Sequence, residues 1–510
     1  MPKFTAYDGT ELAYHLVGTG KPLICLPGGP AWASAYLGDL GGLDAHRQLV
    51  LLDQRGTGDS AVPEEVSSYR CDRLVDDVEA LREHLGLAAV DLLAHSASGN
   101  LATLYAAAHP HRVGSLVLVA PGTRAVGLPV TEDDWRGAVA LREGESWYPE
   151  GRAAFEEIWG GRDFRDLRSA IEPFMYGRWD GAARAHAAAA DSQIRQGNRE
   201  AAAVFYQDGV FDPAVTTRAL AAVEAPVLVL AGEYDGGPTP ALASRLAALF
   251  PHGETAVLPG AGHFPWVDAP GDFARTVAAF LEPGVQSVRT ASGIRLAHRA
   301  WGEVGAPPVV LVHGRGGSGA DWTQVAEGLA ATHRVHALDL RGHGLSDWPG
   351  SYSFEGFRDD LRGFIDALGL AGADVVAHSM GGAAALLLAQ EAPGLVGRLV
   401  LEEPPPLLPL DPPRGFVARP DEELSFDWPV VPDVNVQLNA PDPAWRKGMA
   451  ELAVPVLLVA GGGSSHIDQD RIAEMADLIP DARLVTFDIG HSVHAVLPDE
   501  FLAALREFGI

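Results

Sequence analysis

An internal repeat constrains the possible folds of this chain more than any other feature of its sequence. The segment DGTELAYHLVGTGKPLICLPGG, which begins at Asp8, corresponds to SGIRLAHRAWGEVGAPPVVLVHGRGG, which begins at Ser292. Further along, LLDQRGTGDS from Leu51 corresponds to ALDLRGHGLS from Ala337. Because similar segments recur in the same order, the sequence predicts two copies of one fold.

The length of the chain agrees with two large domains. At roughly 100 to 250 residues per domain, 510 residues accommodate two such copies. We expect the first domain at residues 1–282 and the second at residues 288–510, joined by the short segment EPGVQS. This linker reaches at most about 20 Å, so the two halves are expected to pack against each other.

Composition excludes several classes of partner. With 47% hydrophobic and 21% charged residues, the chain has the balance of a globular protein. A net charge of −29 opposes binding to nucleic acid and to anionic lipid. Two cysteines give no disulfide framework, the opening MPKFTAYDGT is unlike a signal peptide, and no apolar run reaches the roughly 18 residues of a membrane span. We therefore expect a cytoplasmic protein without nucleic-acid or membrane partners.

Each copy contains a serine between a strand-like and a helix-like run. In LLAHSASGN, Ser96 follows the apolar run VDLLA and precedes LATLYAAAH, and in AHSMGG, Ser379 follows ADVVA and precedes AAALLLAQEA. A nucleophile elbow of pattern G-x-S-x-G occupies such a junction, and here the small residues Ala94 and Ser98 replace the two glycines of the first copy. The alternative is that Ser96 merely caps the next helix.

A serine nucleophile requires a histidine base and an acid that orients it. The expected order along the chain is serine, acid, histidine. The first copy supplies Asp235 after the strand-like run in VLVLAGEYDGG and His263 in LPGAGHFPW. Taken singly, Asp235 is consistent with a turn residue and His263 with a surface loop. Together with Ser96, they predict a catalytic triad.

The phrase GRGGSG at Gly314–Gly319 raises a competing hypothesis. It matches the dinucleotide fingerprint G-x-G-x-x-G, and Asp339 follows twenty residues later, where such folds hold a ribose hydroxyl. The corresponding segment of the first copy, LPGGPAWAS, lacks this spacing. We therefore expect neither an organic cofactor nor a metal.

These motifs, in this order, resemble the α/β-hydrolase superfamily over nearly the whole chain. LPGGP with DQRGTGDS resembles proline-iminopeptidase-like hydrolases, and VHGRGGSG with DLRGHGLS resembles the esterase, lactonase and carbon–carbon hydrolase group. The resemblance implies an α/β fold in each half, with a mostly parallel eight-stranded sheet, flanking helices and a lid. It also implies oxyanion holes formed by backbone N–H groups of Gly29 and Ala97 in the first half, and of Arg315 and Met380 in the second.

The acid of the second copy is not at the expected place. An ungapped comparison of the halves puts Ser464 where the first copy has Asp235. Asp468 is expected to cap a helix. The resemblance implies a second position for the acid, at the end of the preceding core strand, where RLVLEEPPP supplies Glu402 and Glu403. We favour Glu402, leaving Glu403 and Asp468 open, or an acidic pair that only faces solvent.

The base of the second copy is expected to be His491 in FDIGHSVHAVLPDEF. The sequence leaves His494 open as a competitor. The glycine before His491 repeats the spelling Gly262-His263 of the first copy, which favours His491.

The lids of the two copies are expected to differ. Residues 122–223 form a long insertion with alanine-rich helical stretches and many aromatics, and TEDD at Thr131 resembles a helix start. Residues 404–454 are about half as many and include PPPLLPLDPP, which is incompatible with a helix, so this cover is expected to be looped and more open.

The sequence therefore predicts a serine hydrolase that cleaves a small ester, lactone, thioester or amide through an acyl-serine. Two alternatives stay open. The second half is a non-catalytic scaffold or ligand-binding module, or the same triad performs lyase or acyltransferase chemistry. The sequence does not identify the substrate.

Overall fold

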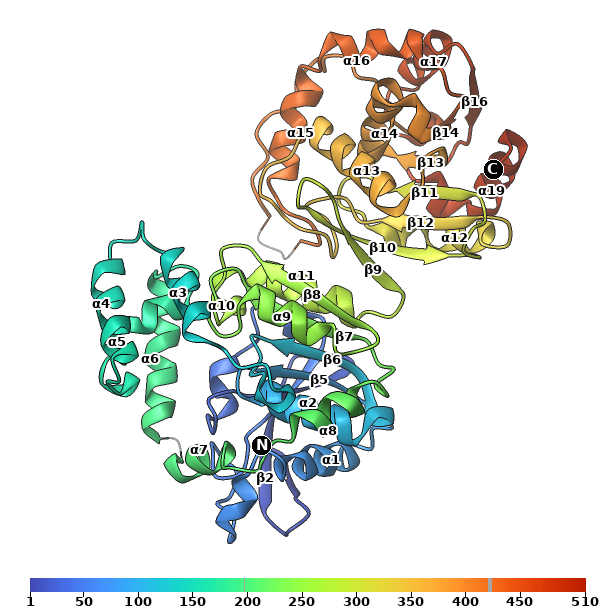
Figure 1. Cartoon of the computed structure of the whole chain (residues 1–510). Helices are drawn as coiled ribbons and strands as arrows, with labels where there is room; N and C mark the ends of the chain where they lie inside the picture. The colour runs from blue at the N-terminus through green and yellow to red at the C-terminus, as the bar shows by residue number, and fades with distance from the viewer. Residues whose placement is uncertain (197, 421–423) are drawn as a thin grey trace. The chain divides into compact units, whose positions relative to one another are not determined.

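The computed structural model describes residues 1–196, 198–420 and 424–510 and consists of two compact units, Met1–Leu281 and Glu282–Ile510 (Figure 1). Each unit is built on one eight-stranded sheet. The linker between the units is shorter than the segment EPGVQS expected from the sequence, because β9 (Val285–Arg289) already pairs with β10 (Arg295–Trp301) in the second sheet. No helix among the described residues is long and apolar enough to cross a membrane.

The first sheet has the strand order β1-β2-β4-β3-β5-β6-β7-β8. Its strands are β1 (Lys3–Thr5), β2 (Glu11–Val17), β3 (Pro22–Leu26), β4 (Gln48–Leu52), β5 (Val90–His95), β6 (Val113–Val119), β7 (Val227–Gly232) and β8 (Gly253–Leu258). β2 pairs antiparallel with β1 and with β4, and the other pairs are parallel. Every residue of β5 and of β7 is buried, which explains why β7 and the centre of β5, residues 92–94, are apolar without the alternation of a half-exposed strand.

The second sheet repeats this topology, with the order β16-β15-β14-β13-β11-β12-β10-β9. Its remaining strands are β11 (Pro308–Val312), β12 (Arg334–Leu338), β13 (Ala373–His378), β14 (Val396–Glu402), β15 (Val456–Ala460) and β16 (Ala482–Thr486). β10 pairs antiparallel with β9 and β12, and the other pairs are parallel. The α/β fold class expected from the sequence is confirmed in both halves.

Helices flank both sheets. In the first unit, α1 (Leu74–His84), α2 (Ser98–Ala108), α8 (Pro213–Leu220) and α9 (Pro240–Ala247) share one core, and α11 (Pro270–Leu281) packs against β8. In the second unit, α13 (Phe354–Leu368), α14 (Ser379–Glu391) and α17 (Gln469–Leu478) cover one face, and α12 (Thr323–Leu329) and α19 (Pro498–Phe508) cover the other. Alternate strand residues point to these two faces, since Leu399 and Leu401 join the first core and Val400 joins the second.

The two lids differ in length and in structure. The first contains α3 (Glu132–Ala140), α4 (Tyr148–Trp159), α5 (Arg168–Ile171), α6 (Gly181–Gln196) and α7 (Arg199–Phe205), of which α3 to α6 gather beside the sheet of their unit (Figure 1). As the TEDD motif predicts, α3 starts with a capping box between Thr131 and Asp134. The second lid is irregular through its prolines, as expected, but it ends in two helices, α15 (Val430–Asn439) and α16 (Pro443–Gly448), so the cover is looped only in its first part.

Two buried histidines make the stability of the second unit sensitive to acid. His298 and His336 lie on β10 and β12 with their Nδ1 atoms 3.4 Å apart. Burial lowers the pKa of each to about 4. An unfolded histidine takes up its proton near pH 6.5, so the free energy of unfolding should fall as the pH drops from about 6.5 to about 4, by up to about 1.4 kcal/mol per pH unit per histidine.

We expect His336→Leu to reduce this slope, because one buried titrating group is removed. Urea unfolding measured between pH 7 and pH 5 checks the expectation. His333→Gln, at a partly exposed position of the same unit, is the matched control. An unchanged pH slope in His336→Leu would contradict the interpretation.

Candidate active sites

In the first unit a sharp turn presents Ser96 at the end of a central strand. Ser96 directly follows β5 and has φ of 52°, a left-handed conformation that is strained for any residue with a side chain. The turn leads into α2, and the loop after β3 passes against it. A Cβ on Gly28 of that loop would lie 2.8 Å from the Ser96 Cβ, so glycine is required for this approach. The nucleophile elbow expected from the sequence is therefore present as a local structure.

The structure brings Ser96, His263 and Asp235 together. The His263 Nε2 atom lies 2.9 Å from the Ser96 Oγ atom, and His263 Nδ1 lies 2.9 Å from Asp235 Oδ2. Asp235 follows β7 and is 2% exposed, and its Oδ1 atom accepts a hydrogen bond from the Gly237 N–H at 2.9 Å. His263 follows β8. Because the carboxyl ends of parallel strands meet at one edge of the sheet, three distant segments supply one site.

Two buried side chains that were not expected from the sequence, Tyr36 and His95, connect the loops around Ser96. The Tyr36 hydroxyl accepts a hydrogen bond from the Gly28 N–H at 2.6 Å and lies 2.8 Å from His95 Nδ1. His95 Nε2 in turn lies 3.0 Å from the backbone oxygen of His263. Burial lowers the pKa of His95, which keeps the ring neutral. The sequence offered one signal for His95: a histidine directly precedes the candidate nucleophile in both copies, His95 before Ser96 and His378 before Ser379.

The second unit has the same elbow. Ser379 follows β13 with φ of 51°, and a Cβ on Gly314 would lie 3.0 Å from the Ser379 Cβ. His491 follows β16, with its Nε2 atom 3.0 Å from the Ser379 Oγ atom. His378 Nε2 lies 2.9 Å from the backbone oxygen of His491, which repeats the contact of His95 in the first unit.

The carboxylate beside His491 belongs to Glu403. Its Oε2 atom lies 3.3 Å from His491 Nδ1. The same side chain accepts hydrogen bonds from the Gly461 N–H, the Ser465 hydroxyl and, at 3.1 Å, the Gln469 amide. Desolvation raises the pKa of Glu403, but the hydrogen bonds from His491, Ser465 and Gly461 outweigh it and hold the pKa below its ordinary value. Glu403 is therefore a buried carboxylate in its ionised form.

The expected pairing of Glu402 with His491 is corrected, because Glu402 contacts His494. Its Oε2 atom lies 2.7 Å from His494 Nδ1, and its Oε1 atom accepts a hydrogen bond from the His494 N–H at 3.0 Å. His494 also stacks on Trp322, with the ring centroids 4.1 Å apart. Neither Glu402 nor His494 has a described contact with Ser379.

Strand geometry explains why Glu403, rather than Glu402, lies beside His491. Glu402 is the last residue of β14 and points to the same face as Val400, toward Trp322 and α19. Glu403 leaves the strand with φ of 49°, as Ala120 leaves β6 with φ of 45° in the first unit. Asp468 caps α17 as expected, accepting hydrogen bonds from the backbone N–H groups of Asp470 and Arg471.

The residues expected to form the oxyanion holes lie beside the serines. Ala97 stands at the N-terminus of α2 and Met380 in the first turn of α14, where backbone N–H groups have no acceptor within the helix. Gly29 lines the cavity that contains Ser96, and Arg315 lines the cavity that contains Ser379. The placement of all four is compatible with donation to a substrate oxygen.

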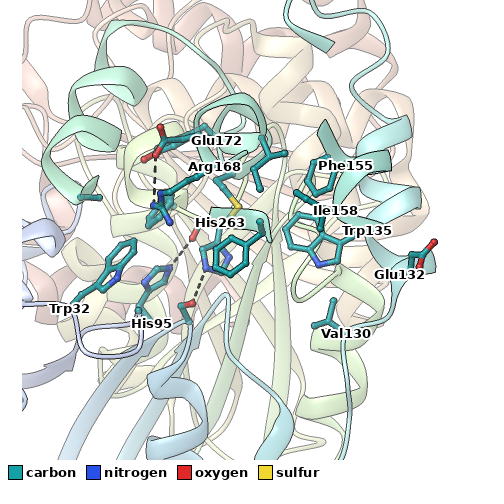
Figure 2. A pocket seen from close by; sticks show the side chains of 18 of the residues that line it. Trp32, His95, Val130, Glu132, Trp135, Phe155, Ile158, Arg168, Glu172 and His263 are labelled. Atoms are coloured by element: carbon teal, nitrogen blue, oxygen red, sulfur yellow. Dashed lines mark hydrogen bonds and ion pairs between the residues drawn. The ribbon is translucent and has the colours of Figure 1, made fainter. Parts of the chain in front are cut away.

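The cavity over Ser96 has a volume of about 470 Å³ and a mainly apolar wall that is rich in aromatic side chains. In Figure 2, Trp135, Phe155 and Ile158 lie on one side of His263 and Trp32 lies on the other. Three charged residues of the lid also line it: Glu132, and the pair Arg168 and Glu172, which lie 3.8 Å apart. Such a wall suits an apolar ligand of moderate size.

The cavity over Ser379 has a volume of about 510 Å³ and a different wall. Prolines and leucines of residues 405–410 line it together with Arg315, Arg414 and His466. The His466 ring lies beside that of His491, with the centroids 4.2 Å apart.

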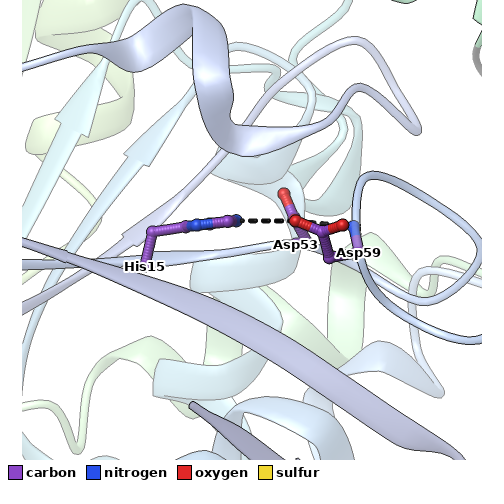
Figure 3. Close-up of side chains that lie close together, drawn as sticks. All are labelled: His15, Asp53 and Asp59. Atoms are coloured by element: carbon purple, nitrogen blue, oxygen red, sulfur yellow. Dashed lines mark hydrogen bonds and ion pairs between the residues drawn. The ribbon is translucent and has the colours of Figure 1, made fainter. Parts of the chain in front are cut away.

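One group of side chains in the first unit has the composition of a metal site. His15, Asp53 and Asp59 place their ligand atoms within 4.8 Å of one another (Figure 3). However, both oxygens of Asp53 already accept hydrogen bonds: from the N–H and hydroxyl of Ser34, from the Asp59 N–H and from His15. These bonds fix a loop, so we assign the group a structural role.

The corresponding aspartate of the second unit, Asp339, also binds backbone N–H groups of a loop, which supports the structural role. Asp339 accepts hydrogen bonds from the Gly319 N–H at 2.6 Å and the Leu345 N–H at 2.9 Å, and Arg299 lies 4.0 Å away. Arg299 takes the place of His15 as the basic neighbour. The carboxylate of Asp339 is thus committed to the loop rather than to a ribose.

Comparison with known proteins identifies the family of the fold. The family model described as alpha/beta hydrolase fold matches residues 21–270 and 307–428. The sn-1-specific diacylglycerol lipase ABHD11 of Mus musculus is 26% identical over 252 residues, covering 41% of this chain and 82% of the lipase. Esterase YbfF of Escherichia coli is 26% identical over 247 residues, covering 39% of this chain and 92% of the esterase.

Among solved structures, the enol-lactonase from Burkholderia xenovorans is 23% identical, with a TM-score of 0.38. The match covers 44% of this chain and 99% of the lactonase chain. The family model spans more than half of the present sequence, in two separate segments that fall in the two units. The chain therefore belongs to the α/β-hydrolase fold family.

Proposed function

We propose that this protein is a serine hydrolase with two active sites, one in each unit. The first uses Ser96 as nucleophile, His263 as base and Asp235 as acid. The second uses Ser379, His491 and Glu403. The observation that carries the proposal is that a continuous hydrogen-bonded chain of serine, histidine and carboxylate occurs in both units.

The geometry supports acyl transfer through a covalent intermediate. The serine Oγ attacks the substrate carbonyl carbon while the histidine Nε2 takes its proton, and the carboxylate stabilises the imidazolium that forms. Backbone N–H groups of Gly29 and Ala97, or of Arg315 and Met380, stabilise the oxygen that becomes negative. The histidine then protonates the leaving group, and a water molecule, activated by the same histidine, hydrolyses the acyl-serine.

We assign ester bonds as the preferred substrate class. The relatives named above are a lipase and an esterase, and the aromatic wall over Ser96 fits an apolar acyl or alcohol group. The resemblance of LPGGP and DQRGTGDS to proline-iminopeptidase-like hydrolases gives aminoacyl amides as the second class to test at Ser96.

The alternative of a non-catalytic second unit has one observation in its favour. Glu403 lies 3.3 Å from His491, whereas Asp235 lies 2.9 Å from His263. Catalytic hydrogen bonds are often longer in the absence of substrate, so we retain two working sites.

Covalent labelling tests the proposal. A fluorophosphonate probe reacts with activated serines, and we expect it to modify both Ser96 and Ser379, as mapped by peptide mass spectrometry. The histidine beside each serine is the physical reason, because it removes the hydroxyl proton. Ser96→Ala and Ser379→Ala should each abolish one modified peptide. Labelling that persists in the double variant would contradict the assignment of the nucleophiles.

A further inference from the structure

Two arginines in the cavity over Ser379 have no ion-pair partner in the described part of the chain. Arg315 comes from the loop after β11 and Arg414 from the lid, and both line the cavity together with Ser379. The Nη1 atom of Arg315 lies 3.4 Å from the Asn435 side-chain oxygen, and that of Arg414 lies 3.1 Å from the same oxygen. Two cations thus share one neutral acceptor.

The backbone around Arg414 is held in place. The Arg414 N–H donates to the Asn439 side-chain oxygen at 2.8 Å, and the Asn439 amide donates to the Arg414 carbonyl at 2.9 Å. Asn435 and Asn439 both lie on α15, one helical turn apart, so one helix face positions the arginine. The lid therefore presents this guanidinium from a fixed segment.

Both arginines line the cavity that also contains Ser379 and His491. His466 lines the same cavity, and its ring lies beside that of His491, with the centroids 4.2 Å apart. Burial lowers the pKa of His466, and the charges of His491, Arg414 and Arg315 lower it further, against an opposing effect of the Glu403 carboxylate. An anion held by the two arginines would therefore occupy the cavity that contains the reacting serine.

The other charged residues of this wall are already engaged or exposed. Arg471 lies 2.8 Å and 3.0 Å from the two carboxylate oxygens of Glu474. Asp468 caps α17, and Asp411 is exposed. In the first cavity, by contrast, Arg168 has Glu172 at 3.8 Å. Among the described residues, a pair of guanidinium groups without an ion-pair partner is notable in a chain of net charge −29.

We infer that the second site binds an acyl substrate that carries an anionic group, held between Arg315 and Arg414. A guanidinium matches a carboxylate or a phosphate in a two-bonded, planar geometry. The inference rests on the proposed function of the second unit and adds its substrate class. The cavity of about 510 Å³ fits a small molecule.

A matched pair of esters tests the inference. In a Ser96→Ala background, kcat/KM is measured for mono-p-nitrophenyl glutarate and for p-nitrophenyl pentanoate, which have acyl chains of equal length and differ in the terminal carboxylate. We expect the protein to prefer the glutarate ester. Arg414→Gln and Arg315→Gln should each reduce the ratio of the two values about 10- to 100-fold, because a hydrogen bond to a charged group is lost.

The ratio is independent of how much of a variant is folded. Arg471→Gln removes the same charge from the same wall, but from an arginine paired with Glu474, and should change the ratio less than about twofold. A preference for the pentanoate ester, or equal ratios in all variants, would overturn the inference.

A binding measurement separates this inference from the proposed catalysis. Glutarate and inorganic phosphate are titrated calorimetrically into the Ser96→Ala, Ser379→Ala protein, with and without Arg414→Gln. Binding of glutarate that weakens in the arginine variant supports a carboxylate substrate, and stronger binding of phosphate assigns the anion as a phosphate. If the Ser96→Ala protein hydrolyses neither ester, the proposed function of the second unit fails, while absence of binding by either anion overturns the inference itself.

Discussion

Glu403→Gln in a Ser96→Ala background should lower the turnover of the second site by a factor on the order of 10⁴. The carboxylate of Glu403 lies 3.3 Å from His491 Nδ1, and in the proposed mechanism it is the acid that orients the imidazole and stabilises its protonated form. An amide of the same size keeps the packing but offers no negative charge. The kcat for an ester that the Ser96→Ala protein hydrolyses measures the effect.

Glu402→Gln is the matched control, because the two glutamates are neighbours in sequence and both are buried. Its carboxylate bonds to His494, so the substitution should cost stability, by about 3 kcal/mol or more for a broken buried pair, with a far smaller fall in turnover of the folded protein. Asp468→Asn should leave turnover nearly unchanged. A larger kinetic loss in Glu402→Gln than in Glu403→Gln would reverse the assignment.

The fold of each half was predictable because the apolar pattern of the central strands follows directly from their burial. Strands buried on both faces, such as β7 and β15, are uninterrupted apolar runs, and the same order of motifs occurs twice. The residues around Ser96 were also predictable. Asp235 and His263 follow consecutive strands of a parallel sheet, and the carboxyl ends of these strands necessarily meet.

The acid beside His491 was not predictable with the same reasoning, because two adjacent glutamates differ only in the direction of their side chains. Strand alternation favours Glu403, since Glu402 continues the face of Val400. The proline that follows supplies a second signal: Pro404 corresponds to Pro121, so Glu403 corresponds to Ala120, the residue that leaves the strand.

Contacts between distant loops lay beyond the sequence. The hydroxyl of Tyr36 bonds to Gly28 and His95 only because a short loop turns back over the elbow. Likewise, Arg315 and Arg414 are 99 positions apart, and nothing in the spacing indicates that both approach Asn435. Such pairs depend on the path of the lid rather than on local pattern.

The central claim is that each unit hydrolyses its own substrates, and four proteins compared on one panel test it most directly: the parent protein, Ser96→Ala, Ser379→Ala and the double variant. The panel contains p-nitrophenyl esters with apolar and with carboxylate-bearing acyl groups, lactones and aminoacyl anilides. Loss of a serine nucleophile removes the acyl-enzyme route, which lowers turnover by a factor on the order of 10⁶.

We expect Ser96→Ala to lose the apolar esters and retain the carboxylate-bearing one, and Ser379→Ala to show the reverse, because the cavity over Ser96 is aromatic and that over Ser379 carries Arg315 and Arg414. The double variant should hydrolyse none of the panel above the rate in buffer. Loss of every activity in one single variant, with no loss in the other, would show that only one unit is catalytic and would contradict the claim.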